Sequence, residues 1–195
     1  MRTFIRSLIA IVALTAIFGF AYPALLVGVG SLAFNGQAQG SLLSRNGTVV
    51  GSALAAQAFT SPRYFHERPS GTTPAYNPGA TTFGNLGPTN PALAKAIHQQ
   101  ALAILKLEGP YNPGLTIHDI PVDAVTTSGS GVDPDISPAY AQLQARRVAA
   151  VRHLPLATVE KQMKQNTTGR SLGFFSEPGV NVLELNLALD KLGGK

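Results

Sequence analysis

A long, uncharged and mostly apolar segment near the N-terminus constrains this chain more than any other feature. Residues 7–44 carry no charged side chain, and Ser7 to Ala33 is almost wholly apolar. A helix on a water-soluble domain needs a polar face, whereas a membrane-spanning helix does not. Leu8 to Gly30 would form about 35 Å of helix, enough to cross a hydrocarbon core of about 30 Å. We therefore predict one transmembrane helix over residues 7–33.

The charges beside this segment predict its orientation. Arg2 and Arg6 are the nearby charges on its N-terminal side, and positively charged flanks stay in the cytoplasm. We expect residues 1–6 to be cytoplasmic and residues 34–195 to lie outside the cytoplasm. The alternative is a cleaved secretory signal, whose apolar core is shorter and ends in a small-x-small cleavage site. The residues at the end of this segment, Leu32 to Asn35, match such a site poorly.

Small and helix-breaking residues inside the predicted span favour packing against another membrane helix. Pro23 removes one backbone donor and should kink the helix, which membranes tolerate when neighbouring groups compensate. Gly19, Gly28 and Gly30 would allow a second helix to approach closely. The alternative is a lone anchor whose glycines face lipid.

The remaining residues, 34–195, fit one small domain of the α+β class, with about four helices and a few short strands. Their net charge is about +3 and is dispersed, which does not indicate nucleic-acid binding. The chain has no cysteine, which excludes disulfides, thiolate metal sites and a cysteine nucleophile. Packing, or a partner protein, must therefore hold this domain together.

Four helices and one hairpin have clear sequence signals. Capping residues followed by apolar stripes predict helices that begin near Asn90, Ser137, Pro155 and Asn181. The last of these should bury the stripe Leu185, Ala188, Leu189 and Leu192 and end at Gly193-Gly194. Asn46-Gly47 predicts a β-hairpin over residues 41–50. Residues 51–90 read as a long ordered loop with several aromatic residues, and residues 122–127 fit either a strand or a short turn.

No catalytic constellation emerges from the motifs. The chain lacks a phosphate-binding loop and a Gly-x-Ser-x-Gly elbow, and its four histidines do not have metal-ligand spacing. Ser128 to Gly131 is rich in Gly and Ser, but a turn explains it better than a nucleophile. Asp133 and Asp135 could bind calcium or act in acid–base chemistry, and we prefer a role for Asp135 near a helix start.

Four ordered segments resemble one known family. They are Phe59 to Ser70, Asn85 to Pro91, Thr127 to Pro138 with Arg147 and Arg152, and Val180 to Leu189, behind a span that contains Tyr22-Pro23. In this order they resemble the C subunit of the Kdp-type potassium-transporting ATPase, over nearly the whole chain. Glu67 and Asp135 depart from the resemblance, which has a glycine and a histidine there.

The resemblance implies a non-catalytic accessory subunit in the bacterial inner membrane. Its partners would be a channel-like A subunit, a P-type ATPase B subunit and a small F subunit, together with the lipid bilayer and no nucleic acid. ATP and the potassium ion would belong to the complex, with no cofactor bound directly by this chain. The family is also described as helping the catalytic subunit to bind ATP, but a direct contact would require the inverted topology.

The sequence suggests candidate contact residues in two loops. Tyr64, Phe65, His66 and Arg68 lie in one, and Ser128, Ser130 and Asp133 lie in the other. Pairing of Arg68 with Asp133 inside the domain is an equal alternative. We expect Gly19, Pro23 and Gly28 to pack in the membrane. Two rival functions are a stand-alone anchored binding protein and a secreted hydrolase that uses the Ser128–Gly131 loop.

Overall fold

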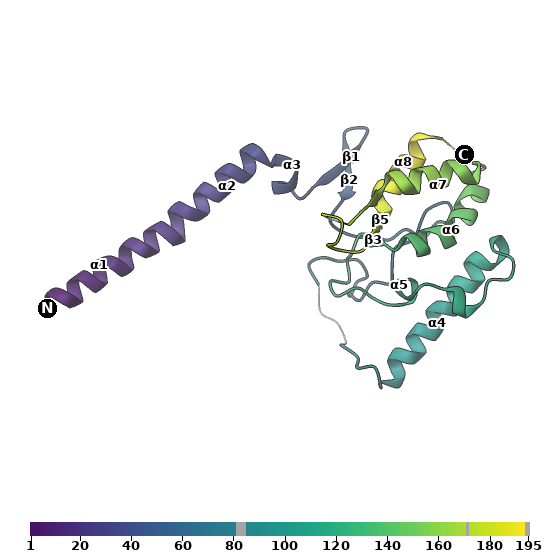
Figure 1. The fold of residues 1–195 in the computed structure, drawn as a ribbon, viewed down its shortest axis with the longest axis horizontal. Helices are drawn as coiled ribbons and strands as arrows, with labels where there is room; N and C mark the ends of the chain where they lie inside the picture. Colours follow the sequence, from purple (N-terminus) through teal and green to yellow (C-terminus); the bar gives the residue numbers. More distant parts are fainter. Residues whose placement is uncertain (81–84, 171, 194–195) are drawn as a thin grey trace. The chain divides into compact units, whose positions relative to one another are not determined.

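The computed structural model describes all residues except 81–84, 171 and 194–195. The chain divides into two compact units, Met1–Val50 and Gly51–Lys195 (Figure 1). Each unit has its own architecture, and the mixture of helices with short strands confirms the predicted α+β class. Residues 81–84 of the predicted long loop, and Gly194 at the predicted end of the last helix, lie outside the described residues.

The first unit begins with one long helix. It consists of α1 (Arg2–Ala16), a π-helical segment (Ile17–Ala21) and α2 (Tyr22–Ala33). Its 32 residues are long and apolar enough to cross a membrane, and none of the most apolar stretch is buried within the protein. Pro23 cannot donate to a carbonyl one turn earlier, and the wider turn lies directly before it, where the Tyr22 amide donates to the Ile17 carbonyl.

A short helix and a hairpin follow the long helix. α3 is Asn35–Ala38, and β1 (Leu42–Arg45) pairs with β2 (Thr48–Ser52). Asn46 and Gly47 have φ angles of 51° and 79° at the turn. These positive φ angles are those of the turn that Asn-Gly favours in two-residue hairpins, so this prediction is confirmed.

The second unit is a helical layer with a small antiparallel sheet. The helices are α4 (Pro91–Glu108), α5 (Val122–Val125), α6 (Pro138–Val151), α7 (Leu156–Gln165) and α8 (Val182–Lys191), with 3-10 turns at Gly109–Tyr111 and Ile117–Asp119. The strands are β3 (Asp135–Ile136), β4 (Thr167–Thr168) and β5 (Gly179–Asn181). Their order is β3-β5-β4, with Ile136 and Thr167 both opposite Val180.

The helix starts follow the predicted caps. The side chains of Asn90, Ser137 and Asn181 accept bonds from the amides of Ala92, Tyr140 and Glu184. The core lies where α6, α7, α8 and β5 meet, and it includes Val148, Val159, Val180, Leu185 and Leu189.

Two sequence predictions need correction or completion. Leu192, predicted to lie in the core, is 46% exposed, because α8 ends at Lys191 and Leu192 extends past it. The ambiguous segment 122–127 contains the helical turn α5, where Ala124 is fully buried.

Candidate partner interface

The first group of candidate residues, Tyr64 to Arg68, lies in the loop formed by residues 61–70. The buried side chain of Arg147 on α6 is hydrogen-bonded to the backbone of this loop. Arg147 Nε donates to Glu108 Oε1 at 2.7 Å, and Nη2 donates to Gln144 Oε1 at 2.9 Å. Nη1 donates to the carbonyls of Pro62 and Tyr64. Burial raises the pKa of Glu108, and the adjacent Arg147 guanidinium offsets part of that shift. One arginine thereby joins α4, α6 and the loop.

A second buried arginine, Arg152 at the end of α6, fastens the same loop. Arg152 Nε donates to the Arg63 carbonyl at 2.7 Å, and Nη2 donates to Asp190 Oδ1 at 2.9 Å. Its guanidinium carbon lies 5.0 Å from the centre of the Tyr64 ring, and the Tyr64 hydroxyl donates to Asp190 Oδ2. The Tyr64 side chain is therefore occupied by contacts inside the domain.

Two buried amide side chains pair with the loop backbone as a neighbouring strand would. The Phe65 amide donates to Asn186 Oδ1 and the Phe65 carbonyl accepts from Asn186 Nδ2, at 2.8 and 3.0 Å. Gln144 makes the same pair of bonds with His66, at 2.7 and 3.0 Å. The Phe65 side chain is fully buried, so it is not available on the surface of the folded domain. Burial also lowers the pKa of His66, whose ring contacts the Ser61 carbonyl.

The second candidate loop is shaped by its serines. Ser128 Oγ accepts from the Gly131 amide at 2.9 Å and lies 3.3 Å from Ser130 Oγ. Ser70 Oγ donates to the Gly131 carbonyl, which fastens this loop to the first one. Gly131 has a φ of 70°, a conformation that favours glycine. Ser130 remains exposed, so its hydroxyl is accessible at the surface of the domain.

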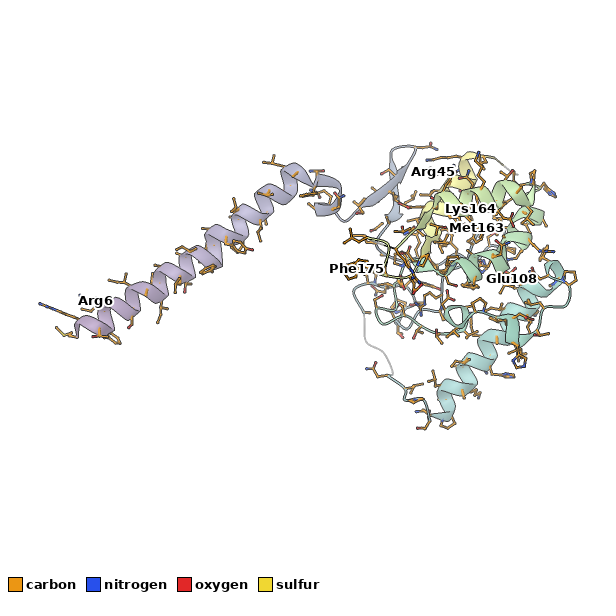
Figure 2. All side chains as sticks on the ribbon, viewed as in Figure 1. Arg6, Arg45, Glu108, Met163, Lys164 and Phe175 are labelled. Atoms are coloured by element: carbon orange, nitrogen blue, oxygen red, sulfur yellow. The ribbon has the colours of Figure 1, made fainter. Side chains whose placement is uncertain are left out.

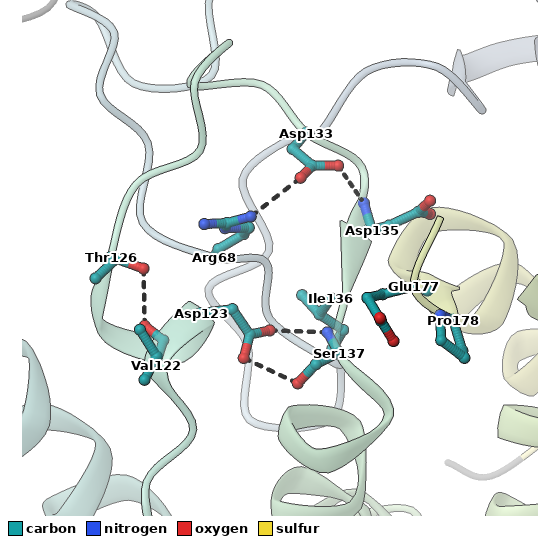
Figure 3. A pocket seen from close by; sticks show the side chains of 11 residues that line it. Arg68, Val122, Asp123, Thr126, Asp133, Asp135, Ile136, Ser137, Glu177 and Pro178 are labelled. Carbon is teal, nitrogen blue, oxygen red and sulfur yellow. Dashed lines mark hydrogen bonds and ion pairs between the residues drawn. The ribbon is translucent and has the colours of Figure 1, made fainter. Parts of the chain in front are cut away.

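Arg68 and Asp133 connect the two loops at the rim of a pocket of about 530 Å³ (Figure 3). Arg68 Nη1 contacts Asp133 Oδ2 at 3.2 Å, and Nη2 donates to the Thr127 carbonyl. The pairing inside the domain that the sequence left open is therefore present. The side chains remain 22% and 34% exposed, so both can also reach a partner.

Four carboxylates, Asp123, Asp133, Asp135 and Glu177, are among the residues that line this pocket. Asp123 accepts from both the amide and the hydroxyl of Ser137, which lies at the start of α6. Asp135 lies in β3 beside Gly179, two residues before Ser137 at the start of α6, and burial raises its pKa, with Asp133 adding to the shift. The described residues contain no group of three or more side chains suited to a metal ion.

Glu67, which precedes Arg68 in the chain, is buried, with only 4% of its surface exposed. Neither of its carboxylate oxygens has a hydrogen-bond partner of good geometry among the described residues. Burial raises the pKa of Glu67 to about 9, and the negative charges of Asp133 and Asp135 contribute to that rise, which the nearby Gln57 backbone offsets only in part. The carboxyl group is therefore protonated in the folded domain at neutral pH.

The structure brings together some of the predicted contact residues and separates others. Arg68 contacts Asp133 and Ser128 lies beside Ser130, whereas Tyr64 is bonded to Asp190 and Phe65 is fully buried. Sequence reasoning missed the buried supports of the loop. These supports are Glu108, Gln144, Arg147, Arg152 and Asn186. Charged and amide residues placed between buried apolar positions of α6 and α8 were the available signal.

Helical geometry separates the residues predicted to pack in the membrane. Within α2, at about 100° per residue, Gly30 lies on the same side of the helix as Pro23, and Gly28 lies on another side. A Cβ added at Gly28 or Gly30 would meet nothing within 4 Å. Both positions thus offer room for a close neighbour.

Comparison with known proteins decides the family. The family model described as "K+-transporting ATPase, c chain" (KdpC) matches residues 4–191. The chain belongs to the KdpC family. A relative from Methylococcus capsulatus, named potassium-transporting ATPase KdpC subunit, is 51% identical over 187 residues, covering 95% of this chain and 96% of the relative. KdpC relatives with the same name from Beijerinckia indica and Mycobacterium bovis are each 46% identical, covering 94% and 98% of this chain and 91% and 99% of their own lengths.

Proposed function

We propose that this chain is the membrane-anchored accessory subunit of an ATP-driven potassium import complex. The observation that carries the proposal is membership of the KdpC family over residues 4–191, in a chain whose long apolar helix precedes one folded unit. The partners would be the channel-like A subunit, the P-type ATPase B subunit and the small F subunit. In this proposal ATP and potassium are bound by those partners, and the present chain is not itself catalytic.

The proposed role of the second unit is to cap and stabilise the outer mouth of the channel-like subunit. A contact surface works best when its loops keep one shape before binding. Here Arg147, Arg152 and Gln144 fix the first loop to α6, and Ser70 fixes the second loop to the first. The accessible polar groups on that base are Arg68, Asp133, Ser128 and Ser130, and they are our proposed contacts.

The proposed orientation places the second unit outside the cytoplasm, away from the nucleotide. Any help with ATP binding would then act through the membrane, by favouring one state of the complex over another. Arg2 and Arg6 before the long helix support this orientation, because positive flanks stay in the cytoplasm. The proposed site of action is the bacterial inner membrane.

Single-cysteine labelling tests the orientation, because the natural chain has no cysteine. In intact spheroplasts we expect a membrane-impermeant maleimide to label Gln165→Cys on α7, which lies outside the proposed contact residues. Thr3→Cys should react only after the membrane is permeabilised. Both positions are exposed, so accessibility within the protein does not distinguish them. The reverse labelling pattern would show that the second unit lies in the cytoplasm. It would contradict the proposed outer cap and make a direct nucleotide contact possible.

A further inference from the structure

The turn between β4 and β5 carries large apolar side chains at the surface of the second unit. Leu172, Phe174 and Phe175 are 82%, 69% and 54% exposed. The two phenylalanine rings lie 4.2 Å apart and so form one continuous apolar surface. Figure 2 shows Phe175 at the periphery of this unit. Single exposed apolar side chains are common, but a contiguous group of large ones is typical of a site that contacts a protein or a membrane.

The base of this turn is closed by ionic contacts. Arg170 Nη2 donates to both carboxylate oxygens of Glu177, at 2.8 and 2.7 Å. Leu172 and Gly173, which lie between these two residues in the chain, have φ angles of 53° and 82°. The result is a narrow turn with an apolar tip and a charged, bidentate ion pair at its base.

The tip is connected to the part of the chain that follows the long apolar helix. β5 continues from the turn, and its last residue, Asn181, donates from Nδ2 to the Ala53 carbonyl at 2.9 Å. Ala53 stands near the start of the second unit, and only residues 34–50 separate that unit from the end of α2. A short connection keeps a protein surface at high local concentration next to the membrane that holds the helix.

We propose that the Leu172–Phe175 tip inserts shallowly into the bilayer, at the boundary between lipid headgroups and acyl chains. This inference rests on the proposed membrane anchor. A specific protein interface needs a broad complementary surface with a polar rim, whereas three side chains on a narrow turn form a small wedge. A fluid bilayer accepts such a wedge without matching its shape, and the Arg170–Glu177 pair remains at the level of the headgroups.

A tryptophan placed at the tip tests this insertion, because the natural chain has no tryptophan. The full chain carrying Phe174→Trp is reconstituted alone into phosphatidylcholine vesicles, with and without lipids brominated at defined depths. The matched control is Val122→Trp, since Val122 on α5 is 73% exposed. We expect the tip tryptophan to show blue-shifted emission and to lose most of its fluorescence to shallowly brominated lipid. The control should respond to aqueous iodide instead.

Any other outcome contradicts the proposed insertion of the tip into the bilayer. Iodide quenching of Phe174→Trp in the chain alone would show that the tip lies in water. If the same tryptophan became shielded only in the assembled pump, the tip would be a protein contact. Removal of the whole chain from vesicles by alkaline carbonate would overturn the anchor as well. Retention in the membrane with a water-exposed tip would overturn the tip insertion alone.

Discussion

Replacing Arg147 by alanine is expected to destabilise the second unit by about 3–5 kcal/mol, because a charge is left buried without its partner. Glu108 would lose the 2.7 Å contact to Nε, and the carbonyls of Pro62 and Tyr64 would lose their donor. Small domains are stable by only about 5–15 kcal/mol. Pulse proteolysis of the full chain in detergent, over a series of urea concentrations, measures the loss.

The neighbouring residue supplies the matched control for this prediction. Arg146 lies next to Arg147 on α6 but is exposed, so Arg146→Ala should change stability by less than about 0.5 kcal/mol. Arg147→Lys keeps the charge but cannot reach all four acceptors, and its loss should be intermediate. Equal stability of the Arg147 and Arg146 variants would show that the buried network does not support the loop.

Replacing Glu67 by glutamine is expected to remove a pH dependence of stability. The pKa of Glu67 is about 9 in the folded domain, whereas an unperturbed glutamate, as in the unfolded chain, has a pKa of 4.5. Between these values the folded state holds a proton that the unfolded state has released, so stability falls as the pH rises, by about 1.4 kcal/mol per unit at most. Glutamine is neutral throughout, so it adds no charge beside Asp133 and Asp135 at any pH.

The difference between the two proteins should therefore grow with pH. We expect Glu67→Gln to match the natural chain near pH 5 and to exceed it by roughly 2–4 kcal/mol at pH 8. Glu160→Gln on α7 is the control: it removes one carboxylate and leaves Glu67 in place, so the pH slope should remain. Urea midpoints measured from pH 5 to 9 test this, and parallel profiles for the natural chain and Glu67→Gln would contradict a buried, protonated Glu67.

Local sequence signals predicted the parts of the fold that depend on local physics. The caps Asn90, Ser137 and Asn181 and the turn at Asn46-Gly47 each act within a few residues, and the structure confirms them. The same reasoning failed at Leu192, because an apolar stripe in the sequence does not show at which residue the helix ends and burial stops. The many turn formers in the predicted long loop gave no sign that Pro62 to His66 are hydrogen-bonded to side chains at α6 and α8.

The candidate surface was predictable only in part, because long-range side-chain contacts decide which loop residues face outward. Arg147 meets Pro62 at a separation of 85 residues, and Asn186 meets Phe65 at a separation of 121. No periodicity in the loop reveals such partners. The loop motif therefore could not show that Phe65 belongs to the core while Arg68, three residues later, stays partly exposed.

The most direct test of the account is the potassium-dependent ATPase activity of the detergent-purified pump, assembled with and without this chain. The account predicts that activity or assembly collapses without the chain and returns when the chain is added back. Adding residues 1–40 alone should then fail to restore activity, which separates the anchor from the outer domain. A pump that assembles and turns over equally well without the chain would contradict the accessory-subunit role.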